Sequence, residues 1–253
     1  MDFLAVGILG SLWGSFANVC IYRLPLKGGV VKGRSFCPKC KKKIFWYENI
    51  PILSYLILGG KCSKCKKKIS TQYLLVEAIS IFSFLIIYYL FGISLTTILL
   101  IILFLSFLII FFIDLKYYII PDILTFPMMV LGFVKSFDPN LNPIFPNYTN
   151  SLLGGIIGYG IIWLIIMFYK KIRNREGMGL GDAKLLAVIG FWFGWISIPF
   201  VIFLSSTIAL IVVVPDLLKR QKKLTSQIPF GPYIIIATTI FILFKEKFLN
   251  LLL

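Results

Sequence analysis

The sequence predicts an all-α polytopic membrane protein with about eight transmembrane helices and one sizeable loop outside the bilayer. Of its 253 residues, 59% are hydrophobic and only 14% are charged, whereas ordinary soluble domains have about 45–50% apolar and about 25% charged residues. So few polar side chains would leave large apolar patches of a soluble core exposed to water, which a lipid environment would not. A water-soluble globular protein is therefore excluded.

Eight apolar segments are expected to cross the membrane, since a spanning helix takes about 20 residues. In order, they are residues 3–22, 73–91, 95–113, 123–137, 151–169, 183–197, 198–215 and 230–244. The boundary between the sixth and seventh segments, after residue 197, rests mainly on Pro199, because proline interrupts helices. Asp2, rather than a basic cluster, precedes the first segment, which is expected to be a retained helix and not a signal peptide.

The basic residues gather on one side of this predicted topology. With the N-terminus outside, the inner loops are 23–72, 114–122, 170–182 and 216–229, and of the 26 lysines and arginines only Lys135, Lys245 and Lys247 lie on the outer side. Cytoplasmic loops of membrane proteins carry such an excess, so the sequence predicts a multi-pass protein of the cytoplasmic (inner) membrane. The net charge of +16 is therefore expected to meet anionic membrane lipid, and no nucleic acid partner is expected.

The longest inner loop holds two Cys-x-x-Cys pairs, Cys37 with Cys40 and Cys62 with Cys65. Four thiolates at this spacing are typical of a closed tetrahedral zinc (Zn2+) site, which stabilises a loop too small to have its own core. Disulfide bonds are the competing interpretation, and the reducing cytoplasmic side disfavours them. Cys20 lies in an apolar segment and is expected to be inert. The chain has no histidine, which excludes His-based triads and His-ligated catalytic zinc.

Acidic residues close to a membrane need a reason, because burying them is costly. Peptide hydrolysis without histidine, metal or an activated serine needs two carboxyls that share one proton and nearly touch. Asp114 and Asp122 would be about 12 Å apart along a continuous helix, and Pro121 breaks that helix, so they form a poor pair. Asp122 is instead expected to cap the start of the fourth span. Asp114 and Asp182 reach the same inner depth in the predicted topology, where helix packing can bring them together.

Glycines surround the second of these acids. Gly179 and Gly181 leave the backbone bare, which would let an extended substrate approach closely, although an ordinary helix start with Asp182 as N-cap is the alternative. Glu77 lies about one turn into the second span, where it either pairs with a nearby lysine or has a function. The glycine-rich stretch 154–158 predicts close helix packing in lipid rather than a nucleotide site.

Taken together, these residues resemble, nearly from end to end, the type IV prepilin peptidases, which are integral membrane aspartic peptidases of the GxGD type. The matching stretches are GSFANV at 14–19, YRLP at 22–25, the paired cysteine knuckles, NIPILSYL at 49–56, GKC at 60–62, Ile69 with Ser70, Tyr73, Glu77, ID at 113–114, IPD at 120–122, GMGLGDAKL at 177–185 and IPFGPY at 228–233. The resemblance implies that Asp114 and Asp182 are the catalytic pair, which cleaves the leader of prepilins and pseudopilins at the cytoplasmic membrane face.

The resemblance also implies a second activity, since many members N-methylate the new N-terminus with S-adenosyl-L-methionine. Glu77 and the cysteine loop are the candidates for this transferase function, with Glu77 as the cofactor-binding residue. Two parts are expected: residues 1–72, with the first transmembrane helix and the cytoplasmic zinc-knuckle loop, and residues 73–253, the membrane aspartic peptidase core. The alternative is a non-enzymatic membrane assembly or transport component with a zinc-binding docking loop, whose acids would be ion ligands near mid-bilayer.

Overall fold

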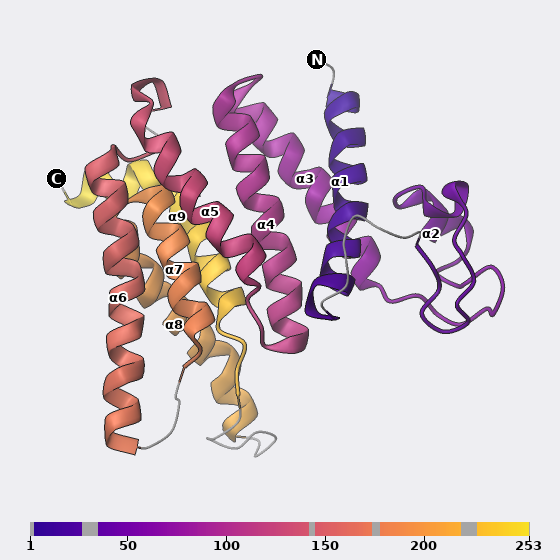
Figure 1. Ribbon diagram of the computed structural model, residues 1–253. Helices are drawn as coiled ribbons and strands as arrows, with labels where there is room; N and C mark the ends of the chain where they lie inside the picture. Colours follow the sequence, from indigo (N-terminus) through magenta and orange to yellow (C-terminus); the bar gives the residue numbers. More distant parts are fainter. Residues whose placement is uncertain (1–2, 27–34, 142–144, 174–177, 219–226, 253) are drawn as a thin grey trace. The chain divides into compact units, whose positions relative to one another are not determined.

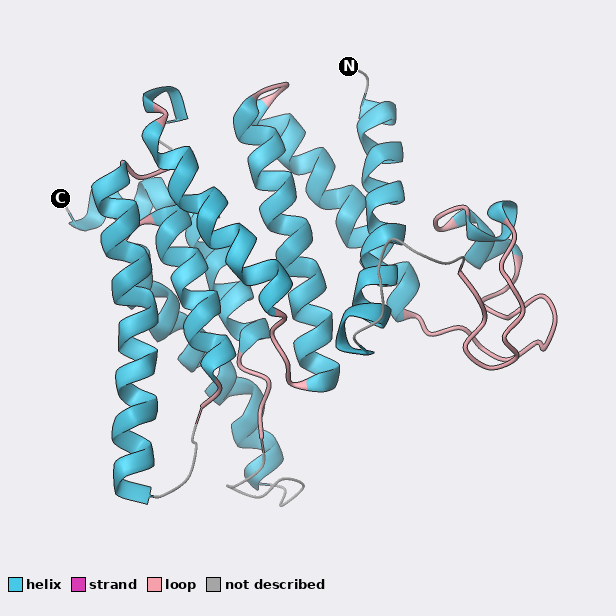
Figure 2. Ribbon diagram, in the orientation of Figure 1, coloured by secondary structure: helices cyan, strands magenta, loops and turns pink. Residues whose placement is uncertain are grey.

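The computed structural model describes residues 3–26, 35–141, 145–173, 178–218 and 227–252. Within this part of the chain every regular element is a helix, and the only β pairing consists of the isolated bridges Phe36–Lys43 and Lys61–Lys68 (Figure 2). The chain divides into two compact units, residues 1–109 and 110–253. The predicted all-α class is confirmed.

The first unit is built around two packed helices. It contains α1 (Phe3–Arg23), the 3-10 turns Leu24–Leu26 and Trp46–Asn49, α2 (Leu53–Ile57), α3 (Gln72–Phe91) and the beginning of α4 (Leu95–Tyr117) (Figure 1). Glycines on α1 let α3 approach closely, because an added Cβ at Gly14 would lie 2.9 Å from the Cα of Glu77. The hydroxyl of Ser80 on α3 donates to the carbonyl of Gly10 at 2.8 Å. Small residues at such crossings are typical of helices that associate in lipid.

The second unit is organised around one fully surrounded helix. It contains the end of α4, α5 (Asp122–Val134), the 3-10 turns Lys135–Phe137 and Pro139–Leu141, α6 (Tyr148–Arg173), α7 (Leu180–Phe193), α8 (Ser197–Leu218) and α9 (Gly231–Leu252). The central helix is α7, which contacts α5, α6, α8 and α9 (Figure 1). Leu185, Leu186 and Ile189 of α7 are completely buried. A helix covered on all sides needs an apolar surface all round, which is what the sequence of α7 provides.

The glycine-rich stretch 154–158 lies on α6 and makes the predicted close helix contact with α7. An added Cβ at Gly190 of α7 would overlap the carbonyl of Gly154, and one at Gly158 would lie 2.6 Å from the carbonyl oxygen of Leu186. The prediction of helix packing at this stretch is confirmed.

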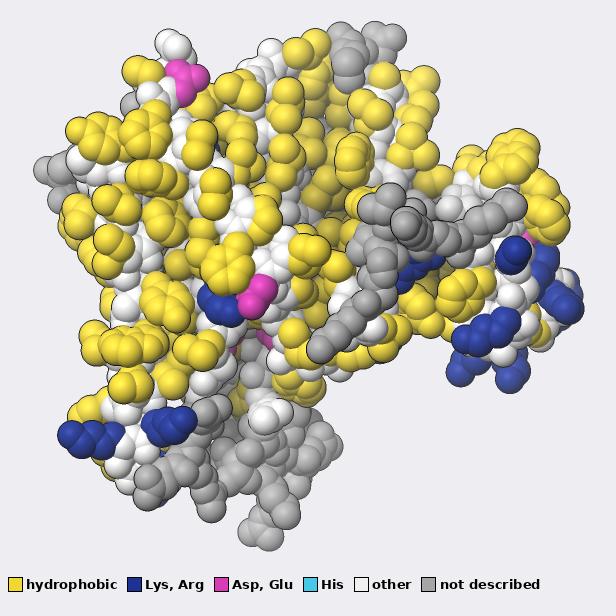
Figure 3. All heavy atoms as spheres, in the orientation of Figure 1, with side chains coloured by type: hydrophobic (Ala, Val, Ile, Leu, Met, Phe, Trp, Pro, Cys, Tyr) yellow, Lys and Arg dark blue, Asp and Glu magenta, His cyan; other side chains and the backbone are white. Residues whose placement is uncertain are grey.

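Within the described residues, five helical segments are long and apolar enough to cross a membrane: Phe3–Leu26, Gln72–Phe91, Leu95–Tyr117, Tyr148–Arg173 and Ser197–Pro215. They coincide with the first, second, third, fifth and seventh predicted segments. The other three predicted segments fall on α5, α7 and the apolar part of α9, Gly231–Phe244, all of which are shorter. A multi-pass protein is therefore confirmed, and the count of eight spans stays a prediction. Figure 3 shows hydrophobic side chains over most of the helical surface in view, and basic groups on the cysteine loop and at one end of α6.

The break between α7 and α8 lies at Gly194, so the boundary after residue 197, which rested on Pro199, was a few residues too late. Gly194 has a φ of 82°, a left-handed conformation that glycine adopts without steric cost. Its amide donates to the carbonyl of Gly190 at 2.8 Å and closes α7. Pro199 lies in the first turn of α8, where a missing N–H costs no intrahelical hydrogen bond.

Candidate active site and metal centre

Asp114 lies in the last turn of α4 with only 4% of its surface exposed. Its Oδ2 accepts a hydrogen bond, at 3.0 Å, from the amide of Gly231, the first residue of α9. The first amides of a helix have no partner inside that helix, so this bond satisfies one of them. The carboxylate therefore lies at the positive end of the α9 dipole, which stabilises its negative charge.

Asp182 is the third residue of α7 and is also buried. The N-cap of α7 is Gly179, which has an extended conformation, and its amide donates to the Asp182 carboxylate. Asp182 is therefore not the N-cap itself, which was the alternative interpretation of the sequence. It occupies the position from which an acidic side chain reaches back to the cap residue.

The two carboxyl groups belong to the same unit and lie close enough for the charge on Asp114 to act on Asp182. Each is held by a backbone amide at the start of a helix, α9 for Asp114 and α7 for Asp182. Two buried carboxyls that interact in this way favour sharing a single proton, because a first negative charge opposes a second. Such a pair can act as acid and base on one substrate.

Ile120 fills the space beside this pair. It is buried, and an added Cβ at Gly181 would lie 3.0 Å from its own Cβ, while one at Gly231 would lie 3.2 Å from its Cδ1. Gly181 is thus needed for packing, and its backbone is not left bare for a substrate as the sequence suggested. Gly179 fits that expectation better, because it is exposed and an added Cβ there would meet only ordinary contacts. Sequence analysis gave Ile120 no role, although it begins the quoted IPD string.

Asp122 does not cap α5. The N-cap of α5 is Pro121, and Asp122 is the first residue inside the helix, with no cap hydrogen bond from its side chain. Its Oδ1 accepts from Lys184 of α7 at 2.6 Å instead. The expectation of a cap was wrong because the nearby ammonium is a stronger donor than an uncharged amide.

Four cysteines of the first unit form one cluster. The Sγ atoms of Cys37, Cys40, Cys62 and Cys65 all lie within 4.8 Å of one another, and all four thiols are free. Cys37 and Cys65 are 4.0 Å apart at Sγ, and Cys40 and Cys62 are 3.9 Å apart. A disulfide would need about 2.05 Å, whereas four sulfurs around a tetrahedral ion at about 2.3 Å would be about 3.8 Å apart. The cluster could therefore hold a metal ion.

The two knuckles have the same backbone design. In the first knuckle, the amide of Cys37 donates to the carbonyl of Lys42 at 2.9 Å, and the carbonyl of Cys37 accepts from the amide of Lys41 at 2.9 Å. In the second knuckle, the amide of Cys62 donates to the carbonyl of Lys67, and the carbonyl of Cys62 accepts from the amide of Lys66, both at 3.0 Å. Lys41 and Lys66 both have a positive φ, of 58° and 56°. The hairpin-like turns thus point both cysteine pairs toward one centre.

The side chain of Lys42 makes one ion pair, and one hydrogen bond to the second knuckle. The Nζ of Lys42 donates to Glu48 at 2.7 Å and to the Ser63 hydroxyl at 2.6 Å. The hydrogen bond from Lys42 lowers the pKa of Glu48 to about 2. Charge balance with Lys42 therefore explains Glu48.

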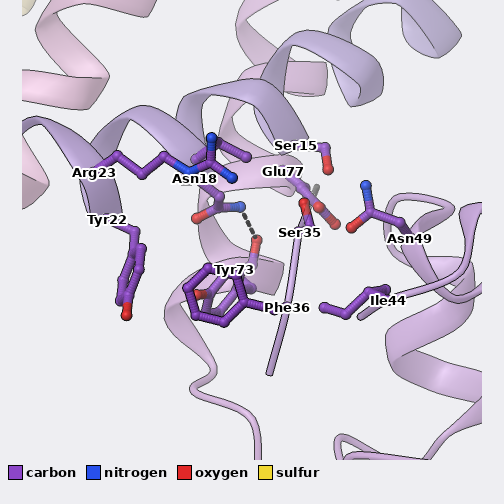
Figure 4. A pocket seen from close by; sticks show the side chains of 11 residues that line it. Ser15, Asn18, Tyr22, Arg23, Ser35, Phe36, Ile44, Asn49, Tyr73 and Glu77 are labelled. Atoms are coloured by element: carbon purple, nitrogen blue, oxygen red, sulfur yellow. Dashed lines mark hydrogen bonds between the residues drawn. The ribbon is translucent and has the colours of Figure 1, made fainter. Parts of the chain in front are cut away.

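Glu77 faces a cavity of about 90 Å³ in the first unit (Figure 4). The carboxylate is 7% exposed and accepts from the amide of Ile52 at 2.8 Å and from the hydroxyl of Ser15. Among the described residues it makes no ion pair with a lysine, so the simple charge-pairing interpretation does not hold there. Asn18, which lines the same cavity, had been noted only as part of a motif.

Several residues considered in the sequence lie outside the described part of the chain. They are Asp2, Lys27, Lys32, Arg34, Arg175, Glu176, Gly177, Lys219, Arg220, Lys222 and Lys223.

Two family models match the chain, and together they cover most of it. The model of the bacterial peptidase A24 N-terminal domain matches residues 8–91, and the model of the type IV leader peptidase family matches residues 99–214. A protein of Pseudomonas aeruginosa named prepilin leader peptidase/N-methyltransferase is 35% identical over 95% of this chain and 89% of its own length. The chain belongs to the type IV leader peptidase family. The resemblance seen in the sequence is thereby confirmed.

Relatives in other bacteria carry the same name. A Neisseria gonorrhoeae protein is 36% identical over 82% of this chain and 79% of its own length, and an Aeromonas salmonicida protein is 32% identical over 97% and 91%. No solved structure is a significant match. The chain thus spans 79% to 91% of the length of these type IV leader peptidase relatives.

Proposed function

We propose that Asp114 and Asp182 are the catalytic pair with which this type IV leader peptidase removes the leader of prepilins and pseudopilins. The activity itself follows from the family: the chain is a prepilin leader peptidase that also N-methylates its product, as its relatives are named. The observation that carries the assignment is the interaction of two buried carboxyls from α4 and α7, each held by a backbone amide at a helix start.

The proposed mechanism needs one proton shared by the pair. The ionised carboxyl takes a proton from a water molecule between the two groups, and the neutral carboxyl donates a hydrogen bond to the scissile carbonyl. The amides of Gly231 and Gly179 hold the two side chains in place, so the geometry does not have to form during the reaction. Burial strengthens both interactions by keeping bulk water out.

The site is proposed to lie at the cytoplasmic surface of the inner membrane. In this proposal, the five long helices together with α5, α7 and α9 form eight spans. Asp114, Asp182 and the cysteine loop then lie on the side of the membrane that carries most of the positive charge. The basic side chains of that side, such as Lys170 and Lys171 at the end of α6, would then meet anionic lipid headgroups. A nucleic acid partner is not proposed.

The cysteine cluster is proposed to bind structural Zn2+. Four thiolates without an open position favour zinc, and the sulfur separations of 3.9 Å and 4.0 Å fit a tetrahedron. When bound, zinc would supply folding energy to residues 35–71, which contain few helical turns of their own.

The methyl donor is proposed to be S-adenosyl-L-methionine, with Glu77 among the residues that bind it. The Glu77 carboxylate, which lines the cavity of the first unit and makes no ion pair among the described residues, supports this assignment. The division into residues 1–72 as loop module and residues 73–253 as peptidase core stays a prediction.

One assay tests both activities. The purified chain in detergent is mixed with a prepilin, with and without S-adenosyl-L-methionine, and the product is analysed by mass spectrometry. We expect a shortened product, and a mass gain of one methyl group only with the methyl donor. The variant Asp114→Asn should give no shortened product, whereas Asp122→Asn should cleave normally because Asp122 pairs with Lys184 at the surface. Full cleavage by Asp114→Asn would refute the assignment.

A further inference from the structure

Two acceptor groups beside the same cavity of the first unit have unused hydrogen-bonding capacity among the described residues. Glu77 receives hydrogen bonds only from uncharged groups among the described residues, the Ile52 amide and the Ser15 hydroxyl. A carboxylate offers about four acceptor positions, so half of its capacity is unused. In a chain with 26 basic residues against 10 acidic ones, it is unexpected that this buried carboxylate makes no ion pair among the described residues, although Arg23 lines the same cavity.

The second acceptor is the side-chain oxygen of Asn18. This residue is 3% exposed, and its amide nitrogen donates to the Tyr73 carbonyl at 3.1 Å (Figure 4). Its Oδ1 is buried and has no donor within the described part of the chain. Buried polar atoms are nearly always hydrogen-bonded, and an unsatisfied one in a native protein often marks a bound group.

We propose that this cavity binds a primary ammonium group carried by a reactant of the methyl transfer. An ammonium brings one positive charge and three donors, which match the carboxylate of Glu77 and the unsatisfied oxygen of Asn18. The inference rests on the proposed methyltransferase function, because that reaction brings such groups to the protein.

The size of the cavity limits what enters it. About 90 Å³ admits the end of a molecule and not a whole nucleoside, since complete ligand pockets measure about 300–1,000 Å³. Two reactants present an ammonium at one end: the chain whose N-terminus leader cleavage has just freed, and the methionyl part of the methyl donor. Both offer the same chemistry to Glu77.

The test measures equilibrium binding to the full chain in detergent. The probes are S-adenosyl-L-homocysteine, its analogue without the amino group, and the tripeptide amide Leu-Ile-Leu with a free or an acetylated N-terminus. Comparing each amine with its blocked or deaminated partner on the wild-type chain needs no substitution, so misfolding cannot mimic the result. We expect the amine to strengthen binding at least about tenfold in one probe pair, which corresponds to about 1.4 kcal/mol.

The variant Glu77→Gln adds the protein side of the test. It keeps the size of the side chain and an oxygen for the Ile52 amide, and we expect it to remove the tenfold preference for the amine. The matched control Glu48→Gln makes the same change in the same unit, on a carboxylate that already pairs with Lys42 and does not line the cavity. Glu48→Gln should bind every probe with the same affinity as the wild-type chain.

The outcomes separate the two sources and the two hypotheses. A preference confined to S-adenosyl-L-homocysteine places the methyl donor in the cavity, and one confined to the free tripeptide places the cleaved substrate there. If neither probe pair shows a preference for the amine, or if Glu77→Gln keeps it, the proposal is wrong. Failure of the methyltransferase function itself would be seen separately, as an absence of methylated product from the wild-type chain.

Discussion

The contact between Gly231 and Asp114 predicts a large effect from a single added methyl group. In Gly231→Ala the new Cβ would lie 2.8 Å from Oδ2 of Asp114 and 3.2 Å from Cδ1 of Ile120. The carboxylate would have to retreat by about 0.6 Å to reach an ordinary contact of 3.4 Å, and its hydrogen bond from the Gly231 amide would weaken. A hydrogen bond to a charged group is worth about 1.5–3 kcal/mol. Because catalysis depends on placement, we expect kcat/KM for leader cleavage to fall by about 10-fold to 100-fold.

The control for this prediction is the same substitution at Gly160 of α6, where an added Cβ meets nothing within 4 Å. Gly160→Ala should leave cleavage unchanged and stabilise the helix by up to about 1 kcal/mol. Both variants are measured by the initial rate of leader removal from a purified prepilin, with thermal unfolding followed in parallel. If Gly231→Ala cleaved as fast as Gly160→Ala, Gly231 would not hold the reacting carboxylate.

Two further predictions concern packing and the metal. Gly190→Ala would place its Cβ against the carbonyl of Gly154 and separate α7 from α6. We therefore expect the protein to lose about 1–3 kcal/mol of stability, measured by thermal unfolding in detergent. An unchanged melting temperature would contradict the close contact. Replacing Cys37 or Cys62 by Ser should remove most bound zinc, measured by elemental analysis of the purified chain, and should speed trypsin cleavage within residues 35–71. Full zinc content in both serine variants would show that the four thiols of the cluster do not hold the ion.

Much of the fold could be predicted because lipid imposes a simple pattern on the sequence. Apolar stretches such as residues 95–113 can only be spanning or buried helices, and their observed bounds, Leu95–Tyr117 for α4, differ by a few residues. The break between α7 and α8 could not be placed as well. Proline is tolerated in a first turn, so Pro199 gave a misleading boundary, whereas the left-handed conformation of Gly194 depends on how the two helices pack.

The identities of the site residues could be predicted better than their partners. The shortage of acids and the lack of histidine left few candidates, and the predicted topology and the family resemblance then pointed to Asp114 and Asp182. Their supports could not be derived, because the Gly231 amide lies in another helix, more than a hundred residues along the chain from Asp114. In the same way, the ion pair of Asp122 with Lys184 and the hydrogen bond of Glu77 with Ile52 join distant segments that only tertiary packing brings together. Local patterns specify which groups are present, and packing decides which groups meet.

The catalytic pair is tested most directly by whether its two members act as one unit. The rate of leader cleavage is measured under single-turnover conditions for Asp114→Asn, Asp182→Asn and the double variant, all checked for folding and zinc content. We expect each single variant to lose nearly all activity and the double variant to lose no more than either one, because a shared proton requires both carboxyls. Losses that add independently, or substantial cleavage by either single variant, would contradict the account.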